Sequence, residues 1–298
     1  MPSLRETKDH IASVRGTLKI TSAMKLVASA KLRKSQRAIE GLRPYESALN
    51  EILTEMLSEV PCELGPTSEA GGFGVSGDMD GAAVRKVAIV AVASNSSLCG
   101  GFNSNVIKKA LETVQAYRTE GYEVEVHAVG RKMAEAMRKA GFDSPEDYSD
   151  MIGHPEYAKS SALADSLSER FGKGELSRVV LVYNHFVTTS KQEATVEQYL
   201  PFEGANASGG EPAGTSEYII EPSAEEVVNS LMPQVLLLKF HSAILDSAAA
   251  EHAARTVAMQ TATDNAQELL GDLTLEYNKG RQQKITSEIL DLLGGSAR

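Results

Sequence analysis

The chain has 298 residues, of which 42% are hydrophobic and 23% charged, with a formal net charge of -10. This length allows one large domain or two modest ones, with enough apolar residues to bury a core. Trp is absent and aromatic residues make up only 5%, a composition that favours long helices over a β-sandwich. No run of about 18 apolar residues occurs, which excludes a membrane-spanning helix. We therefore expect membrane contact only through partners.

The charge is distributed unevenly along the chain. Residues 1–43 hold ten Lys or Arg against three acidic residues, a local charge of +7, whereas residues 44–230 carry -15. Such a basic end predicts an acidic partner, either nucleic acid or an acidic protein surface. A solvated helix face is the third interpretation, and composition does not choose among them.

The cysteines and histidines point away from metal and disulfide chemistry. Cys62 and Cys99 have no metal-ligand spacing, and the six histidines show no His-x-x-x-His pair. We expect a reducing compartment, no metal, and a packed structural role for Cys99. From the first residues we expect neither a signal peptide nor a transit peptide.

A long helix is predicted at the N-terminus. Ser3-Leu4-Arg5-Glu6 has the spacing of a capping box, in which the serine and the glutamate each satisfy an amide of the first turn. Apolar residues then recur at helical spacing for about forty residues, or roughly 60 Å. They are Leu4, Ile11, Val14, Leu18, Met24, Val27, Leu32, Ile39 and Leu42.

The middle of the chain alternates between strand and helix patterns. Residues 62–82 are rich in Gly, Ser and acidic residues and predict a flexible connection. The apolar run Val87–Ala93 is typical of a buried parallel strand. Further strands are predicted at 123–129 and 179–183, helices at 104–117, 131–140 and 157–171, and antiparallel edge strands at 192–200 and 217–220.

A second long helix is predicted at the C-terminus. The 65 residues after Pro233 contain no proline, and Ala243–Ala262 includes eight alanines that favour close helix packing. The fold class is therefore α/β, with two long terminal helices forming an antiparallel coiled coil and a Rossmann-like α/β domain inserted between them. We expect a coiled-coil helix at 1–60, a flexible insertion at 61–84, the α/β domain at 85–221 and the second coiled-coil helix at 222–298.

The loop after the first predicted strand stands where an α/β fold binds phosphate. In its residues, 94–103, the glycines are adjacent and do not have the Gly-x-Gly-x-x-Gly spacing of the dinucleotide-binding fingerprint. The Gly-Lys-Ser/Thr of a Walker motif does not follow either. A dinucleotide-dependent enzyme requires that fingerprint, so we expect no cofactor.

Several segments, in order along the chain, resemble the signatures of ATP synthase gamma subunits. They are 20–33 (ITSAMKLVASAKLR), 98–103 (LCGGFN), 251–259 (EHAARTVAM), 262–266 (ATDNA) and 277–286 (YNKGRQQKIT). Asn95-Ser96-Ser97 stands where the family commonly has Asp-Arg-Gly, and Gly280 replaces a frequent alanine. We expect Gly280 to soften its helix by about 1 kcal/mol without affecting the coiled-coil pairing. The two-cysteine regulatory insertion of chloroplast members is absent, so thiol control is not predicted.

The resemblance implies a non-catalytic rotor subunit of a proton-translocating ATP synthase. Its partners would be three alpha and three beta subunits, the epsilon subunit and the ring of c subunits, at the cytoplasmic face of the bacterial cell membrane. It implies that Arg281, Gln282 and Thr286 hydrogen-bond to a loop of beta, and that Met24, Lys25 and Arg255 meet an acidic segment of beta. Each of these six residues also has a simpler interpretation as helix surface.

A coiled-coil scaffold or a nucleic-acid-binding protein with an α/β domain is the alternative. The basic N-terminal helix fits a nucleic-acid binder, but residues 231–298 hold six basic and eight acidic groups. That slightly acidic end conflicts with a uniformly basic footprint, so no nucleic-acid partner is expected.

Overall fold

The computed structural model describes residues 3–59, 85–202, 220–221 and 223–295. The chain divides into two compact units. The coiled-coil unit comprises residues 1–30 and 255–298, and the α/β unit comprises residues 31–254. Two long helices, α1 (Leu4–Glu59) and α6 (Ala224–Gly295), contribute residues to both units. The predicted fold class, an α/β sheet flanked in sequence by long terminal helices, is confirmed.

The sheet of the α/β unit has four strands in the order β2-β1-β3-β4. β1 (Lys86–Val92) pairs in parallel with β2 (Glu123–Val129) and β3 (Arg178–Thr188), while β4 (Lys191–Leu200) is antiparallel to β3. The predicted strand at 123–129 and the antiparallel edge at 192–200 are confirmed, and β3 is longer than predicted. Most of the strand expected at 217–220 lies outside the described residues.

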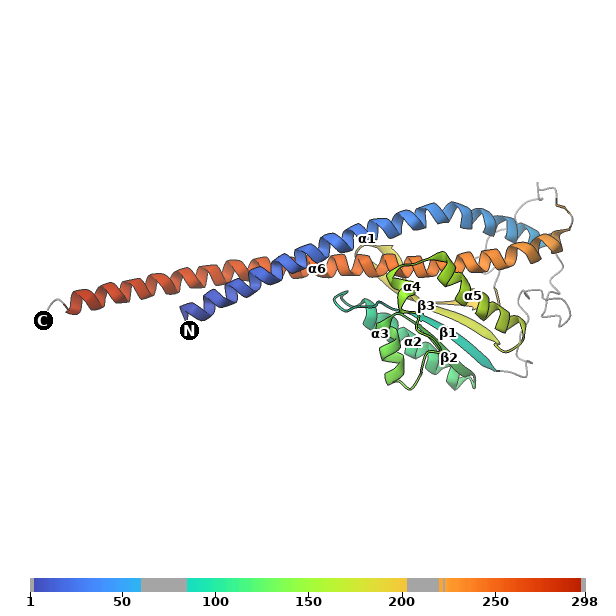
Figure 1. Cartoon of the computed structure of the whole chain (residues 1–298), viewed down its shortest axis with the longest axis horizontal. Helices are drawn as coiled ribbons and strands as arrows, with labels where there is room; N and C mark the ends of the chain where they lie inside the picture. The colour runs from blue at the N-terminus through green and yellow to red at the C-terminus, as the bar shows by residue number, and fades with distance from the viewer. Residues whose placement is uncertain (1–2, 60–84, 203–219, 222, 296–298) are drawn as a thin grey trace. The chain divides into compact units, whose positions relative to one another are not determined.

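Helices cover both faces of this sheet (Figure 1). Alternate residues of β1, Val87, Ile89 and Ala91, pack with α2 (Phe102–Thr119) and α3 (Arg131–Lys139). The residues between them contribute to the other face, which carries α5 (Tyr157–Gly172) and parts of α1 and α6. This period of two is what a strand buried on both faces requires. The short helix α4 (Ser149–Gly153) was not predicted, because five residues are too few to show a helical period.

Both terminal helices continue through a proline. Pro44 lies inside α1, which extends to Glu59 and so exceeds the forty residues that the apolar pattern predicted. Pro233 lies inside α6. An interior proline removes one backbone hydrogen bond. Around these prolines Leu49, Leu53, Met232 and Val235 are buried in the core, and this packing favours the continued helix.

Side chains of the loop that follows β1 form hydrogen bonds within the loop itself. Asn103 Oδ1 accepts hydrogen bonds from the Ser94 amide (3.0 Å) and the Ser94 hydroxyl (2.9 Å). The first amides of α3 are also occupied, since Arg131 N donates to Asn95 Oδ1 and Lys132 N to Ser94 O. Cys99 is 1% exposed, which confirms its predicted packed position.

Gly130 connects β2 to α3 at a point where no other residue fits. Its φ is +94°, and a Cβ there would overlap the carbonyl oxygen of Ala93. That oxygen belongs to the backbone of the residue that directly follows β1 and whose amide donates to Val129 O, so the end of the sheet itself would have to move.

Replacing Gly130 with Ala should therefore destabilise the α/β unit by about 3 kcal/mol or more. Gly141 is a matched control, because its φ is +86° but no atom lies within 4 Å of the added Cβ. Gly141→Ala should cost only the backbone strain, about 1 kcal/mol. Urea unfolding of both variants measures the difference, and equal losses would contradict the steric argument.

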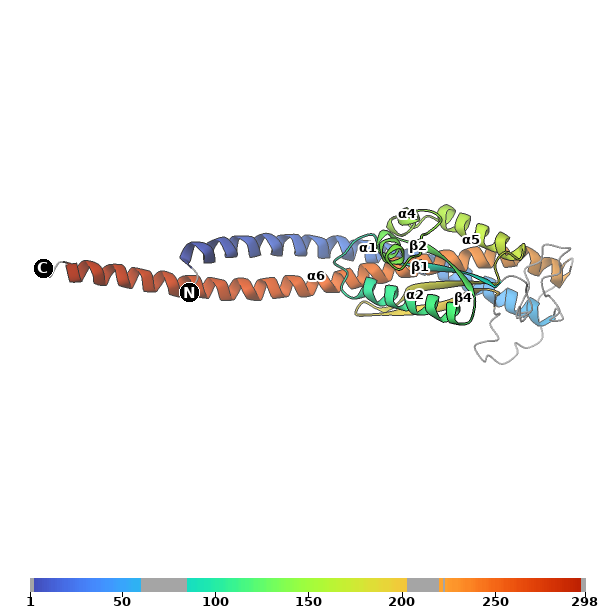
Figure 2. The same cartoon turned by 90° about the horizontal axis from the view of Figure 1, so that it is seen from below.

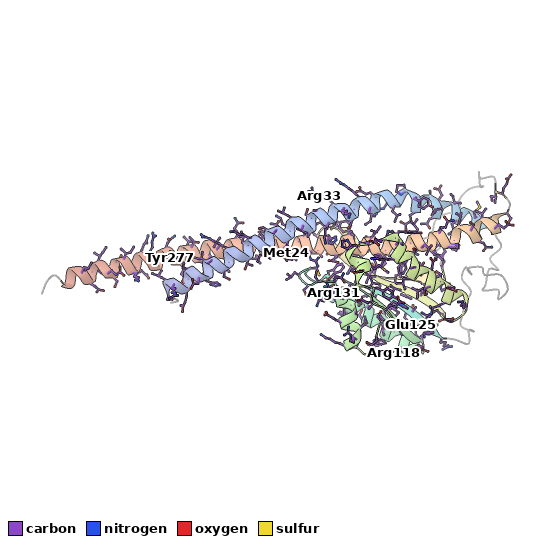
Figure 3. The ribbon with its side chains drawn as sticks, viewed as in Figure 1. Met24, Arg33, Arg118, Glu125, Arg131 and Tyr277 are labelled. Atoms are coloured by element: carbon purple, nitrogen blue, oxygen red, sulfur yellow. The ribbon has the colours of Figure 1, made fainter. Side chains whose placement is uncertain are left out.

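An ion cluster ties β2 to α5 and β1. The Glu125 carboxylate accepts two 2.8 Å hydrogen bonds from Arg170 Nη1 and Nη2, and Lys86 Nζ lies 3.1 Å from Glu125 Oε2. His127 Nε2 lies 3.0 Å from Glu125 Oε1, and burial lowers the pKa of His127. Figure 3 labels Glu125 within the sheet. The bidentate Arg170 contact lowers the pKa of Glu125 from 4.5 to about 2.

This depressed pKa predicts an acid-sensitive contribution to stability. A carboxyl group whose pKa falls on folding stabilises the native state above its ordinary pKa, and the contribution is lost as the pH falls toward the folded-state pKa. Glu125→Gln should thus lower the free energy of unfolding by about 2 kcal/mol at pH 7, with the difference from wild type shrinking below about pH 4.5. Urea unfolding across this range, with the exposed Glu112→Gln as control, tests it; a pH-independent difference would refute it.

Candidate partner-contact surface

The predicted capping box starts α1. Ser3 N donates to Glu6 Oε2 at 2.8 Å, and Glu6 N donates to Ser3 Oγ at 3.3 Å. The backbone hydrogen bond from Ser3 is the main cause that lowers the pKa of Glu6. This reciprocal pair confirms the helix start read from the sequence.

In the coiled-coil unit, α1 and α6 pair in antiparallel fashion (Figures 1 and 2). Ile11 and Val14 of α1 form a buried cluster with Ala266 and Leu273 of α6. Leu18, Leu270 and Tyr277, the last labelled in Figure 3, pack against that cluster. The two helices are thus held together by an apolar seam.

Two threonines of α1 also belong to the seam. Thr7 is 5% exposed, and Thr21 is 9% exposed with its Oγ1 3.0 Å from Thr263 Oγ1. Val27, one of the residues in the apolar pattern that predicted this helix, is 58% exposed. The buried face follows the spacing of Thr21 and Ala28, and Val27 lies beside it.

The first group of predicted site residues lies along this helix pair. Lys25 Nζ donates to Gln260 Oε1 at 2.7 Å. Gln260 Nε2 in turn donates to Asp264 Oδ1 and Oδ2 at 2.8 and 2.9 Å. Met24 and Arg255 are half-buried, like Lys25. Gln260 and Asp264 were not predicted as site residues, and the only sequence signal was that Asp264 falls in one of the family-like segments.

The second group lies further along α6. Gly280 packs against Leu4, because a Cβ built on Gly280 would lie 3.1 Å from Leu4 Cδ2. Gly280 therefore lies at the contact between α1 and α6, and the expectation that it leaves the helix pairing unaffected stays a prediction. Beyond it, residues 281–292 of α6 are all exposed, including Arg281, Gln282 and Thr286. Thr286 Oγ1 donates to Gln282 O at 2.9 Å.

This exposed end of α6 is unusually apolar. Ile285, Ile289, Leu290 and Leu292 are between 47% and 74% exposed. Nearer the seam, Ile20, Leu26 and Val27 are between 58% and 67% exposed. Apolar side chains gathered on exposed helix faces indicate surfaces that another chain covers.

The basic residues of α1 face solvent. All the Lys and Arg side chains of residues 3–43 are exposed except Lys25, which is half-buried. Within the described parts of the chain, the ion pairs are formed by other cations, such as Lys86, Arg170 and Lys239. Among the same residues no His, Cys, Asp and Glu cluster could hold a metal, and no helix is long and apolar enough to cross a membrane.

A helix pair with a sheet domain inserted between its two helices defines a coiled-coil protein with an α/β insertion. A profile described as ATP synthase matches residues 3–297. An ATP synthase gamma chain of Phocaeicola vulgatus is 48% identical over 298 residues, covering 99% of each chain. The gamma chain of Parabacteroides distasonis is 42% identical over 298 residues, covering 100% of this chain and 99% of the relative. The chain belongs to the ATP synthase gamma family.

Solved structures share the fold at lower identity. A chain of the Euglena gracilis mitochondrial ATP synthase, from an assembly of OSCP, F1 and c-ring, gives a TM-score of 0.59 at 16% identity, covering 99% of this chain and 93% of that one. A chain of the Tetrahymena thermophila central stalk and c-ring gives 0.55 at 21% identity, covering 82% and 99%.

Gly271 and Gly280, both within α6, provide a test of the pairing at Leu4. Gly271→Ala should stabilise the helix by about 1 kcal/mol, because nothing lies within 4 Å of the added Cβ and alanine is the better helix former. Gly280→Ala should gain less, because Leu4 must shift by a few tenths of an ångström. Thermal unfolding compares them. An equal gain at both positions would show that Leu4 does not restrict Gly280.

Proposed function

We propose that this chain is the central-stalk rotor subunit of a rotary, proton-translocating ATP synthase. The proposal rests on membership of the gamma family and on one observation in this structure. The end of α6 from Arg281 to Leu292 extends past its pairing with Leu4, carries exposed apolar side chains, and so requires a surrounding partner. In this role the chain transmits rotation of the c-ring to a hexamer of three alpha and three beta subunits and regulates its ATPase activity.

The helix pair suits this mechanical role. Two helices packed along an apolar seam resist bending better than one, and a single helix beyond the pair makes the rotor asymmetric about its axis. When an asymmetric surface turns inside a ring, it contacts each beta subunit in succession. Each contact stabilises one of two conformations of the catalytic site, so rotation becomes a sequence of population shifts.

Two sets of contacts follow from this arrangement. Arg281 and Gln282 are free on the exposed helix to donate hydrogen bonds to a loop of beta, and those from the Arg281 guanidinium are the strongest when the acceptor is charged. Thr286 already donates its proton within α6, so its hydroxyl serves beta as an acceptor.

The helix pair supplies the other set. Lys25 remains able to donate two further hydrogen bonds while it is held by Gln260, which directs its charge toward an acidic segment of beta. Arg255 adds a second charge, and Met24 offers a flexible apolar surface suited to a sliding contact.

The chain itself carries out no chemistry in this proposal and needs no cofactor. ATP is made or hydrolysed in the alpha/beta hexamer, and ions cross the membrane through other subunits. The chain would lie at the cytoplasmic face of the cell membrane, attached through the c-ring and the epsilon subunit.

The proposed domain boundaries remain those expected from the sequence. They are the helical segment 1–60, the insertion 61–84, the α/β domain 85–221 and the helical segment 222–298.

Nucleic-acid binding is a weaker alternative. The exposed basic residues of α1 would favour it, but α6 presents a stripe of exposed acidic residues in the same coiled-coil unit. These are Asp264, Glu268, Asp272 and Glu276. Such a stripe would repel phosphates.

Reconstitution with alpha and beta subunits tests the proposal. One copy of the chain should join three of each in size-exclusion chromatography with mass determination, and ATP hydrolysis should rise. The double variant Arg281→Ala/Gln282→Ala should lower that stimulation about tenfold, because it removes charge-assisted hydrogen bonds.

The matched control changes the opposite face of the same helix, where Gln283 and Ser287 are exposed. Gln283→Ala/Ser287→Ala should leave hydrolysis within about twofold of wild type. A chain that stays apart from alpha and beta, under conditions where a gamma chain from a relative assembles, contradicts the proposal. Equal losses in both double variants would contradict the assignment of the contact.

A further inference from the structure

The α/β unit contains a pocket that the rotor role does not use. It lies between the segment that follows α3, the short helix α4 and helix α5, which are neighbours in Figures 1 and 2. Its volume is about 510 Å³. A space of this size holds a side chain with part of its backbone.

The rim of the pocket is acidic. Glu146, Asp147 and Asp150 line it, and the segment 143–150 contains four acidic residues and no Lys or Arg. Lys159 is the basic residue of the lining, and its Nζ lies 3.9 Å from Asp150 and 3.7 Å from Glu156. Within the described chain no ion pair links Glu146 or Asp147 to a basic side chain. Asp147 Oδ1 accepts a 2.9 Å hydrogen bond from Ser149 N, and both carboxylates retain lone pairs for an external cation.

The floor of the pocket is apolar. Met151 and Leu163 line it and are only 3% and 6% exposed. An acidic rim above an apolar floor matches a side chain with an alkyl stem and a cationic head, because the stem packs on the floor while the head stays at the rim.

The pKa of Tyr148 reflects the same acidic and partly buried environment. Its ring lines the pocket, and burial, followed by the charges of Glu146 and Glu125, raises the pKa of Tyr148 to about 12. The phenol therefore stays protonated.

A metal ion fits this pocket less well, because no group of described His, Cys, Asp and Glu residues is close enough to hold one.

We propose that this pocket binds a lysine or arginine side chain of another subunit of the same ATP synthase complex. The inference rests on the proposed function, and it adds a specific contact for the α/β unit. The negative rim attracts the basic segment, and the apolar floor selects a long side chain over a short one. The contact would fix the α/β unit to a neighbour that turns with it.

Cross-linking in the assembled complex tests this proposal. A photoreactive benzoylphenylalanine placed at Ala162, an exposed residue of the lining, should form one major adduct with a single neighbouring subunit. Mass spectrometry should locate the adduct within a segment that contains Lys or Arg. The neutral triple variant Glu146→Gln/Asp147→Asn/Asp150→Asn should lower the yield at least about fivefold, because it removes the attracting charge.

The control removes the same number of carboxylates from the opposite layer of the sheet. Glu112→Gln/Glu120→Gln/Glu135→Gln changes exposed positions on or next to α2 and α3 and should leave the yield unchanged. Circular dichroism and thermal unfolding check that both triple variants fold.

Each other result overturns the inference. An assembled complex that gives no adduct, an adduct in a segment without Lys or Arg, or a yield unaffected by the neutral triple variant would each refute the pocket contact alone. A chain that does not assemble with alpha and beta refutes the proposed function, and the pocket contact with it.

Discussion

The structure depends on the close approach of α6 to the surfaces that pack on it, and small side chains make that approach possible. In the α/β unit Ala248, Ala249, Ala250 and Ala253 are at most 1% exposed, so backbones and larger side chains can pack directly on the helix. In the coiled-coil unit the same purpose is served by Thr21, Ala266 and Gly280. A larger residue at any of these buried alanines would push the neighbouring element away and weaken contacts over several turns, since a helix moves largely as one body.

Much of this architecture can be predicted from the sequence, because local patterns determine it. The capping box at Ser3 and Glu6 and the buried strand β1 follow from spacing and side-chain type alone. Pro44 shows the limit, since its local preference is outweighed by the core contacts of Leu49 and Leu53. Thr21 was missed because a polar residue does not enter an apolar pattern, although its hydroxyl meets Thr263 across the seam.

The candidate contact surface is less predictable, because a contact with another chain leaves no hydrogen bond inside this one. Arg281 and Gln282 were found only through resemblance to the family, and their exposure is the same as that of an ordinary helix surface. The exposed Ile285 and Ile289 are more informative, since apolar residues on an uncovered helix call for a partner. Gln260, which accepts a hydrogen bond from Lys25, is distant from it in sequence. This contact becomes visible only once the pairing of α1 with α6 is known.

The antiparallel pairing also governs when the protein can fold during its synthesis. Lys25 and Gln260 are separated by 235 positions in the chain, and Thr21 and Thr263 by 242. A ribosome must therefore complete nearly the whole polypeptide before α1 can pair with α6. The strands of the sheet emerge earlier and pair over shorter sequence separations. Until then the apolar side chains Ile11 and Val14 remain without their native cover. The nascent N-terminal segment therefore carries uncovered apolar side chains through most of synthesis, and its many exposed lysines and arginines help to keep it soluble by mutual repulsion.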